Sequence, residues 1–142
     1  HRFENPDITR LPRFLTAPGN PGHGFGALQK APAALVTEIR SLAMPVSLDE
    51  ATLAGNIEDK TNNAPLTVDR LRQIVDLLYP LAAVQLLHAA QAVDLRPGYR
   101  QGEGTARLQR AFRRLVPFVD QDRALTGELA ATTAWLQGES LE

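Results

Sequence analysis

The sequence contains no cysteine. This absence excludes disulfide bonds, thiolate metal sites and a cysteine nucleophile, and it is typical of a reducing compartment such as the cytoplasm. The three histidines, His1, His23 and His88, are too far apart in the sequence to form an HxH or HxxxH metal motif. We therefore predict a cytoplasmic protein without a metal site.

The sequence also lacks an excess of charge of either sign. Lys and Arg total 15 and Asp and Glu total 16, so the formal net charge of the 142 residues is −1. Such a chain has no overall field that attracts a polyanion or an anionic membrane surface. A local cluster has no interleaved aromatic residues and is interpreted as a solvated helix face; it contains Arg107, Arg110, Arg113 and Arg114. We expect neither a nucleic-acid partner nor a membrane partner.

No alternating pattern typical of a β-strand occurs along the chain. Residues 1–26 are so rich in proline and glycine that we predict an extended loop. The glycine-rich run 19–26 follows no strand and is not closed by Lys-Ser or Lys-Thr, so it is interpreted as a turn rather than a phosphate loop. The chain begins at His1 without Met or an apolar signal core, which resembles a cut edge, and we expect a fragment.

Apolar residues at three- and four-residue spacing predict helices in the rest of the chain. The first covers 27–42, with a kink or late start near Pro32, and the central one covers 67–95. Shorter carboxy-terminal helices are predicted within 104–137, and the irregular connection 43–66 is long enough to have a function in a pocket. The predicted fold class is all-α, a helical bundle formed by a single helical domain or fragment over 1–142.

The helix predicted at 67–95 carries the strongest helical signal. Its inner face is expected to contain Leu71, Ile74, Val75, Leu78, Leu81 and Ala82. From 77 to 93 the helix is apolar nearly all round, which is typical of a central helix enclosed by neighbours. A membrane span is the competing interpretation, but Gln85, His88 and Gln91 interrupt the apolar stretch. We expect these three residues to form a hydrogen-bonded polar seam between helices.

The loop Asn56-Ile57-Glu58-Asp59 indicates a family. Adjacent carboxylates diverge, so alone they indicate only solvated or capping groups. Together with other matches, the loop resembles the histidine and phenylalanine ammonia-lyase family. These matches are Phe14-Leu15, Gly24-Phe25, Gln29, Glu38, Leu42-Ala43, Pro45, Ser47 and Asp49, followed by the stretch from Ala83 to Arg96 and the tail residues Val116-Pro117-Phe118, Asp120, Asp122 and Arg123.

The resemblance implies the carboxy-terminal part of an all-helical homotetramer whose active sites combine loops from several subunits. The family's electrophile, a methylidene-imidazolone (MIO), forms from an internal Ala-Ser-Gly, a tripeptide that these 142 residues lack. No residue of this chain is therefore assigned to the cofactor, and we expect the chain alone to be inactive. The implied reaction eliminates ammonia from an aromatic amino acid, which is histidine, tyrosine or phenylalanine, and leaves an α,β-unsaturated acid.

The resemblance places Glu58 in the active site as a catalytic residue. Gly26, Ala54 and Asn56 would line the substrate-binding wall with it. Glu58 stands where histidine lyases carry Glu and where phenylalanine or tyrosine lyases usually carry Gln. Gly26 replaces the Met of histidine lyases, which removes side-chain volume, and Lys60-Thr61-Asn62-Asn63 replaces their usual His-Val-Ser-Met. The identity of the aromatic substrate stays open.

Two alternatives to a lyase also stay open. One is an aromatic amino acid 2,3-aminomutase, and the other is a non-catalytic helical scaffold or oligomerisation module. In every case the helix from 77 to 93 alone would display a large apolar patch, so we predict self-association or association with the remaining lyase polypeptide.

Overall fold

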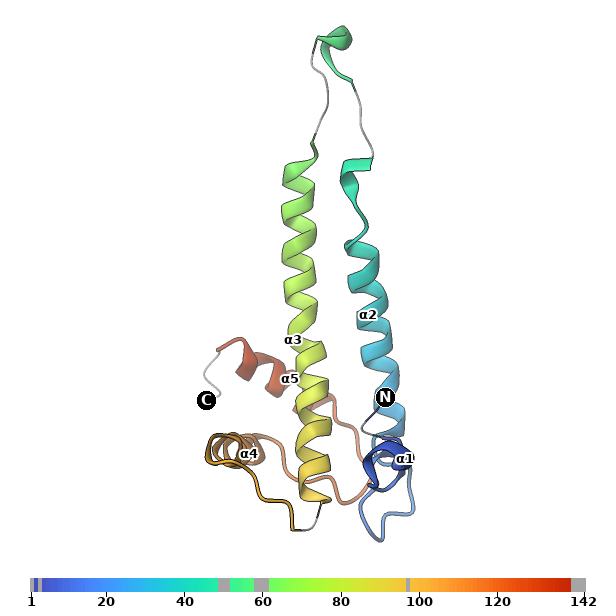
Figure 1. Cartoon of the computed structure of the whole chain (residues 1–142), viewed down its shortest axis with the longest axis vertical. Helices are drawn as coiled ribbons and strands as arrows, with labels where there is room; N and C mark the ends of the chain where they lie inside the picture. The colour runs from blue at the N-terminus through green and yellow to red at the C-terminus, as the bar shows by residue number, and fades with distance from the viewer. Residues whose placement is uncertain (1, 3, 49–51, 58–61, 97, 139–142) are drawn as a thin grey trace.

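The computed structural model describes residues 2, 4–48, 52–57, 62–96 and 98–138. Two antiparallel helices, α2 (Lys30–Leu42) and α3 (Ala64–Asp94), lie side by side and form an elongated stalk (Figure 1). The short helix α1 (Pro6–Thr9), α4 (Glu103–Leu115) and α5 (Thr126–Leu136) gather around the lower end of α3. The described residues include no β-strand, and the all-α prediction is confirmed.

The apolar core lies at the base of the stalk rather than along it. The lower part of α3 packs there against α4, α5 and the amino-terminal loop. The largest fully buried apolar side chains are Phe25, Phe112, Leu15, Leu87, Val84 and Val116. Each large side chain buried in this way stabilises the fold by about 1.5–3 kcal/mol.

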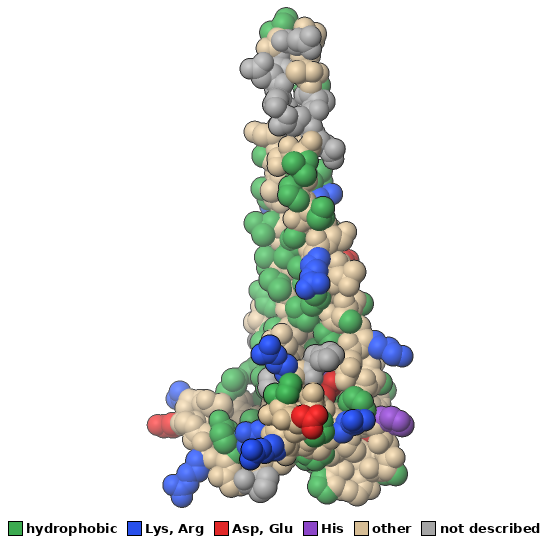
Figure 2. All heavy atoms as spheres, turned by 45° about the vertical axis from the view of Figure 1, so that its right-hand side comes forward, with side chains coloured by type: hydrophobic (Ala, Val, Ile, Leu, Met, Phe, Trp, Pro, Cys, Tyr) green, Lys and Arg blue, Asp and Glu red, His purple; other side chains and the backbone are tan. Residues whose placement is uncertain are grey.

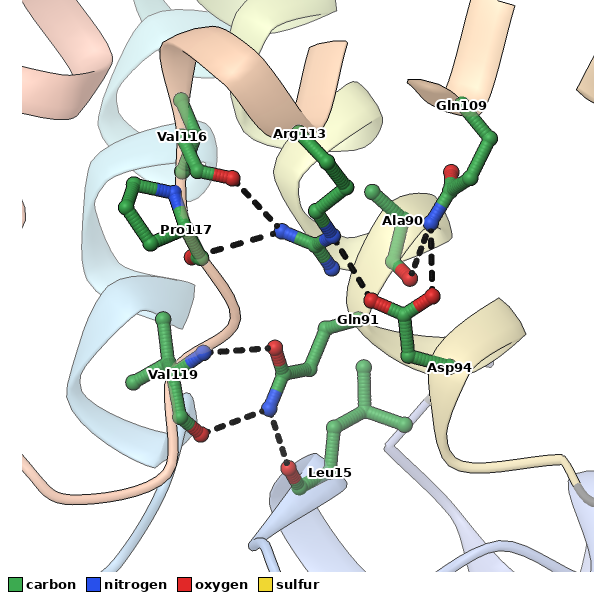
Figure 3. A network of polar contacts seen from close by, with 9 residues as sticks. All are labelled: Leu15, Ala90, Gln91, Asp94, Gln109, Arg113, Val116, Pro117 and Val119. Carbon is green, nitrogen blue, oxygen red and sulfur yellow. Dashed lines mark hydrogen bonds and ion pairs between the residues drawn. The ribbon is translucent and has the colours of Figure 1, made fainter. Parts of the chain in front are cut away.

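Gln91 joins three segments inside this core. Its side chain is fully buried and pairs with both backbone groups of Val119, donating to the carbonyl at 2.8 Å and accepting from the N–H at 3.2 Å (Figure 3). Its amide also donates to the carbonyl of Leu15 at 3.4 Å. A buried polar group without partners would be costly, so these bonds fix the tail and the amino-terminal loop on α3.

A second polar cluster lies one turn further along α3. The Arg113 Nε donates to Asp94 at 2.7 Å, and the Gln109 amide donates to the same carboxylate at 2.9 Å and to the Ala90 carbonyl at 3.2 Å (Figure 3). Arg113 also donates to the carbonyl of Val116 at 3.1 Å. Burial lowers the pKa of the Arg113 guanidinium, and the nearby Asp94 carboxylate opposes that shift. The cluster fixes α4 against the end of α3.

Prolines inside α2 and α3 do not end these helices, and the late start predicted near Pro32 is confirmed. Pro80 lies inside α3, which continues through it for all 31 residues. Pro32 lies in the first turn of α2, where its missing N–H costs little, and the residues before it form a 3-10 turn, η2 (Gly26–Gln29). The helix expected from residue 27 therefore starts as an α-helix only at Lys30.

The amino-terminal loop contains more helix than we predicted. Residues 1–26 were expected to be extended, but they include α1 and a 3-10 turn, η1 (Arg13–Leu15). Asn5 accepts a hydrogen bond from the N–H of Asp7 at 2.9 Å, and Pro6 begins the helix. A capping Asn followed by Pro at the first helical position is a recognised helix start, and its brevity hid it among the other prolines.

The predicted inner face of the long helix is largely exposed on the isolated chain. Leu71, Val75 and Leu78 have relative exposures of 58%, 42% and 45%. Hydrophobic side chains also extend along the stalk surface in Figure 2. The prediction that neighbours enclose this helix holds only for its lower part, because, of the described helices, α2 alone lies beside the upper part (Figure 1). In the lower part Ala83, Val84, Leu87, Ala90 and Ala92 are buried, so the apolar patch expected over 77–93 is largely covered within the chain.

α3 is long and apolar enough, by length and composition, to cross a membrane. The core helix of a soluble protein can meet the same criteria of length and composition. In α3, 28% of the apolar 18-residue window that meets them is buried within this chain.

Candidate functional site

Gly26 lies at the base of the stalk, where the amino-terminal loop enters α2. The preceding residue, Phe25, is 1% exposed, and its ring meets the His88 ring edge-on at a centroid distance of 5.0 Å and an angle of 82°. Its backbone N–H donates to the Phe14 carbonyl at 2.8 Å. Gly24, with φ of +52°, passes so close to that carbonyl that a Cβ would lie 2.7 Å from the oxygen. Only glycine fits there, which gives the Gly24-Phe25 match a structural reason.

Asp122, an exposed residue of the segment between α4 and α5, binds the same amino-terminal loop. Its carboxylate accepts hydrogen bonds from the N–H groups of His23 and Gly24, at 2.7 and 3.0 Å, and from the Asn20 side chain at 2.8 Å. A Cβ at Gly22 would clash with this carboxylate. The hydrogen bond from His23, and then that from Asn20, lowers the pKa of Asp122. Asp122 was singled out in the sequence only by its match to the family's tail, without an assigned role.

The other candidate residues lie at the far tip of the stalk. Ala54 and Asn56 belong to the 3-10 turn η4 (Ala54–Asn56), in which Ala54 and Gly55 have φ values of +52° and +65°. Ala54 is exposed, and a positive φ at alanine is a strained conformation of the kind often found at functional loops. Glu58, the predicted catalytic residue, lies outside the described residues, as does Asp59.

One chain does not bring these candidates together. α2 separates Gly26 from η4, and its 13 residues alone span about 20 Å. Figure 1 shows the two regions at opposite ends of the stalk. Within one copy, Gly26 and Asn56 therefore cannot form the single substrate-binding wall that the family resemblance implied.

Glu4 and His88 form a buried acid–histidine pair, of which only His88 was predicted from the sequence. His88, predicted to be a hydrogen-bonded core residue, is 5% exposed, and Glu4 is 3% exposed. The His88 Nδ1 lies 2.8 Å from the Val84 carbonyl, which can only accept, so Nδ1 carries a proton. The Nε2 lies 2.8 Å from Glu4, whose other oxygen accepts from Gln29. Since 84 residues separate Glu4 from His88, no sequence spacing indicated the pair.

The other members of the predicted polar seam behave differently from each other. Gln91 is buried and bonded, as predicted, whereas Gln85 is exposed and lies on a groove between α2 and α3 with His88 and Arg40. The described residues contain no cluster of histidine and carboxylate groups that would hold a metal ion.

Comparison with known proteins identifies the family. The model of the aromatic amino acid lyase family matches residues 1–114. This chain belongs to the aromatic amino acid lyase family. The histidine ammonia-lyase of Alkaliphilus metalliredigens (strain QYMF) is 36% identical over 124 residues, which are 87% of this chain and 24% of that protein.

Solved structures share the fold of this family member. Ergothionase of Treponema denticola, described as an ergothioneine-degrading enzyme, superposes with a TM-score of 0.89 at 34% sequence identity. The superposition covers 96% of this chain and 28% of the ergothionase chain. Pantoea agglomerans phenylalanine aminomutase superposes with a TM-score of 0.81 at 25% sequence identity, over 95% of this chain and 27% of the aminomutase chain. The chain spans about a quarter of the length of these relatives.

Proposed function

We propose that this chain is one part of an aromatic amino acid ammonia-lyase and supplies residues to one wall of its active site. The observation that carries the proposal is the family match over residues 1–114, within which lies the Asn-x-Glu-Asp loop at 56–59. Glu58 is the proposed catalytic carboxylate, accepting a hydrogen bond from the substrate's ammonium group or ring. Gly26, Ala54 and Asn56 would line the substrate.

The proposed pocket needs at least two copies of this chain. Gly26 and η4 lie at opposite ends of α2, so one copy would supply the base of its stalk and another would supply its tip. The exposed apolar side chains along the stalk favour such an assembly, because Leu71, Val75 and Leu78 would be covered by neighbouring helices. A homotetramer in the cytoplasm is the proposed state of the whole protein.

The electrophile must come from outside this sequence. These 142 residues contain no Ala-Ser-Gly from which MIO could form. MIO would supply the electrophilic carbon for the elimination, and none of the residues described here is assigned to it. The proposed contribution of this chain is limited to binding and orienting the amino acid and to exchanging a proton at the Glu58 carboxylate.

The deciding experiment uses the natural polypeptide that contains these residues. Ammonia release and formation of the unsaturated acid would be followed with histidine, tyrosine and phenylalanine. Replacement of Glu58 by Gln should lower kcat by about 10²–10⁴-fold, the usual contribution of a positioned acid or base. The neighbouring change Asp59→Asn is the matched control and should retain most of the activity.

Two other outcomes would redirect the assignment. A β-amino acid product in place of the unsaturated acid would indicate an aminomutase, which the phenylalanine aminomutase neighbour favours as the second candidate. A protein that assembles but neither converts nor binds any aromatic amino acid would contradict the lyase proposal and favour the scaffold.

A further inference from the structure

We infer that the buried Glu4–His88 pair positions the turn by which the chain enters α2, and with it the proposed substrate-lining residue Gly26. The inference rests on the proposed function, because that function assigns Gly26 to the wall of the active site. Glu4 and His88 themselves are not among the residues proposed to touch the substrate.

The pair holds the turn on both sides of Gly26. Before the glycine, the ring of Phe25 meets the His88 ring edge-on at a centroid distance of 5.0 Å. After the glycine, Gln29 is the last residue of η2, and its side-chain amide donates a hydrogen bond to the Glu4 carboxylate. Gly26 therefore lies between two residues, each of which contacts one member of the pair.

A second connection runs through the backbone of the amino-terminal loop. The Glu4 carbonyl accepts a hydrogen bond from the Phe14 N–H at 3.2 Å, and the Phe14 carbonyl accepts one from the Phe25 N–H at 2.8 Å. The N–H of Gly26 donates to the His23 carbonyl at 3.0 Å. A displacement of Glu4 would therefore reach the turn through its main chain as well as through its side chain.

Both nitrogen atoms of the His88 ring are engaged inside the protein. Nδ1 donates to the Val84 carbonyl, and Nε2 lies 2.8 Å from the Glu4 carboxylate. No ring nitrogen is left to exchange a proton with a substrate, and the two contacts fix the orientation of the ring. His88 belongs to α3, where Val84 and Leu87 beside it are 2% and 1% exposed. The pair is thus a fixed anchor with a positioning role.

Each member of the pair depends on the other because both are buried. The side chains of His88 and Glu4 have relative exposures of 7% and 2%. Removal of one partner from a buried acid–base pair leaves the other uncompensated, whereas replacement of both by apolar side chains of similar volume is often nearly neutral. Single substitutions should therefore displace the turn more than a double apolar substitution does.

The first arm of the test is steady-state kinetics on the natural polypeptide, with whichever of histidine, tyrosine and phenylalanine it converts best. The variants are Glu4→Met, Glu4→Gln, His88→Leu and the double variant Glu4→Met, His88→Leu. Arg113→Met is the matched control, because it breaks a partly buried ion pair of α3, that with Asp94, which holds α4 and not the turn. Thermal unfolding would show that each variant folds and how far it is destabilised.

The second arm is hydrogen exchange, which does not depend on activity. The backbone N–H groups of Phe25, Gly26 and Leu28 donate hydrogen bonds in and beside the turn, at 2.8, 3.0 and 3.0 Å. These amides should exchange faster in Glu4→Met than in the wild type, because the turn loses its contacts with the pair. Arg113→Met should leave their exchange unchanged.

The kinetic constants distinguish positioning from a simple loss of folded protein. A displaced wall weakens substrate binding and raises KM, whereas a smaller folded fraction lowers the apparent kcat and leaves KM unchanged. Glu4→Met and His88→Leu should each raise KM by about tenfold, as for the loss of a pocket contact. Glu4→Gln keeps one carbonyl acceptor and should raise KM less than Glu4→Met. The double variant should raise KM by less than the product of the two single effects.

Several results would overturn the inference, and only one of them also removes the proposed function. An active wild type whose KM responds to Glu4→Met no more than to Arg113→Met contradicts the positioning role, and so does unchanged exchange at the turn amides. Single effects that multiply in the double variant would show that the two residues do not act as a pair. A wild type that is inert with all three amino acids overturns the proposed function as well. If Glu4→Met does not fold, Glu4→Gln and the double variant decide by the same criteria.

Discussion

Replacing Gln91 by Leu should destabilise the base of the stalk more than any change of comparable size on the stalk surface. The substitution conserves much of the volume but leaves three buried backbone groups without their partner, namely the N–H and carbonyl of Val119 and the carbonyl of Leu15. An unpaired buried donor or acceptor costs about 1–3 kcal/mol. The bonds to Val119, at 2.8 and 3.2 Å, should account for most of the loss, and the bond to Leu15, at 3.4 Å, should add little.

The net loss follows from two opposing terms. Two strong bonds give a cost of about 2–6 kcal/mol, and burial of the leucine side chain returns about 1–2 kcal/mol. From the middle of these two ranges, we expect the free energy of unfolding to fall by about 2.5 kcal/mol.

Urea unfolding followed by circular dichroism measures this loss directly. Gln85→Leu on the same helix is the matched control, because Gln85 is exposed and its replacement should change stability by less than about 0.5 kcal/mol. If Gln91→Leu unfolds at the same urea concentration as this control, the bonds to Val119 do not hold the tail in place, and the reasoning fails.

Two further predictions concern the loop and the stalk. Asp122 accepts bonds as a carboxylate and its pKa is lowered, so its contribution to loop order is present above its unfolded pKa and is lost as pH falls through the lower folded value. Asp122→Ala should therefore speed hydrogen exchange at the His23 and Gly24 amides at neutral pH. In this variant acidification should cause little further loss of amide protection, because the carboxylate is already absent. Unchanged exchange at neutral pH would contradict this role of Asp122. Leu71→Glu with Val75→Glu should shift sedimentation toward smaller species, whereas Asp69→Ala, also exposed, should not; unchanged association would show that this face is not an interface.

The helices were predictable because their signals are local. Apolar spacing within the chain was sufficient to locate α2 and the long α3 to within about three residues, the usual uncertainty of helix ends inferred from sequence. The cap at Asn5 and the start at Pro6 were equally local but too short to be distinguished from a loop. The family followed from the Asn-x-Glu-Asp loop and its companions, which are a matter of residue identity and need no coordinates.

The candidate site stays a prediction at the level of single residues, because spacing along a chain does not reveal where those residues lie in space. Gly26 and Asn56 are 30 positions apart in the numbering, and a rigid helix keeps them at opposite ends of the stalk. Apolar periodicity likewise identified Leu71 and Val75 as an inner face without showing that this face lacks a neighbour in a single chain.

The sequence by itself determined the helical class and the family, since each depends on local pattern or residue type, and it is the source of the prediction that Gly26, Asn56 and Glu58 belong to the active site. Only the tertiary structure decided the partners of buried polar groups, because hydrogen bonds such as those of Glu4 with His88 and Asp122 with His23 join residues 84 and 99 positions apart. It also decided that the Phe14 ring lies against Gly26, because that contact depends on a left-handed backbone conformation which no sequence preference for phenylalanine would suggest.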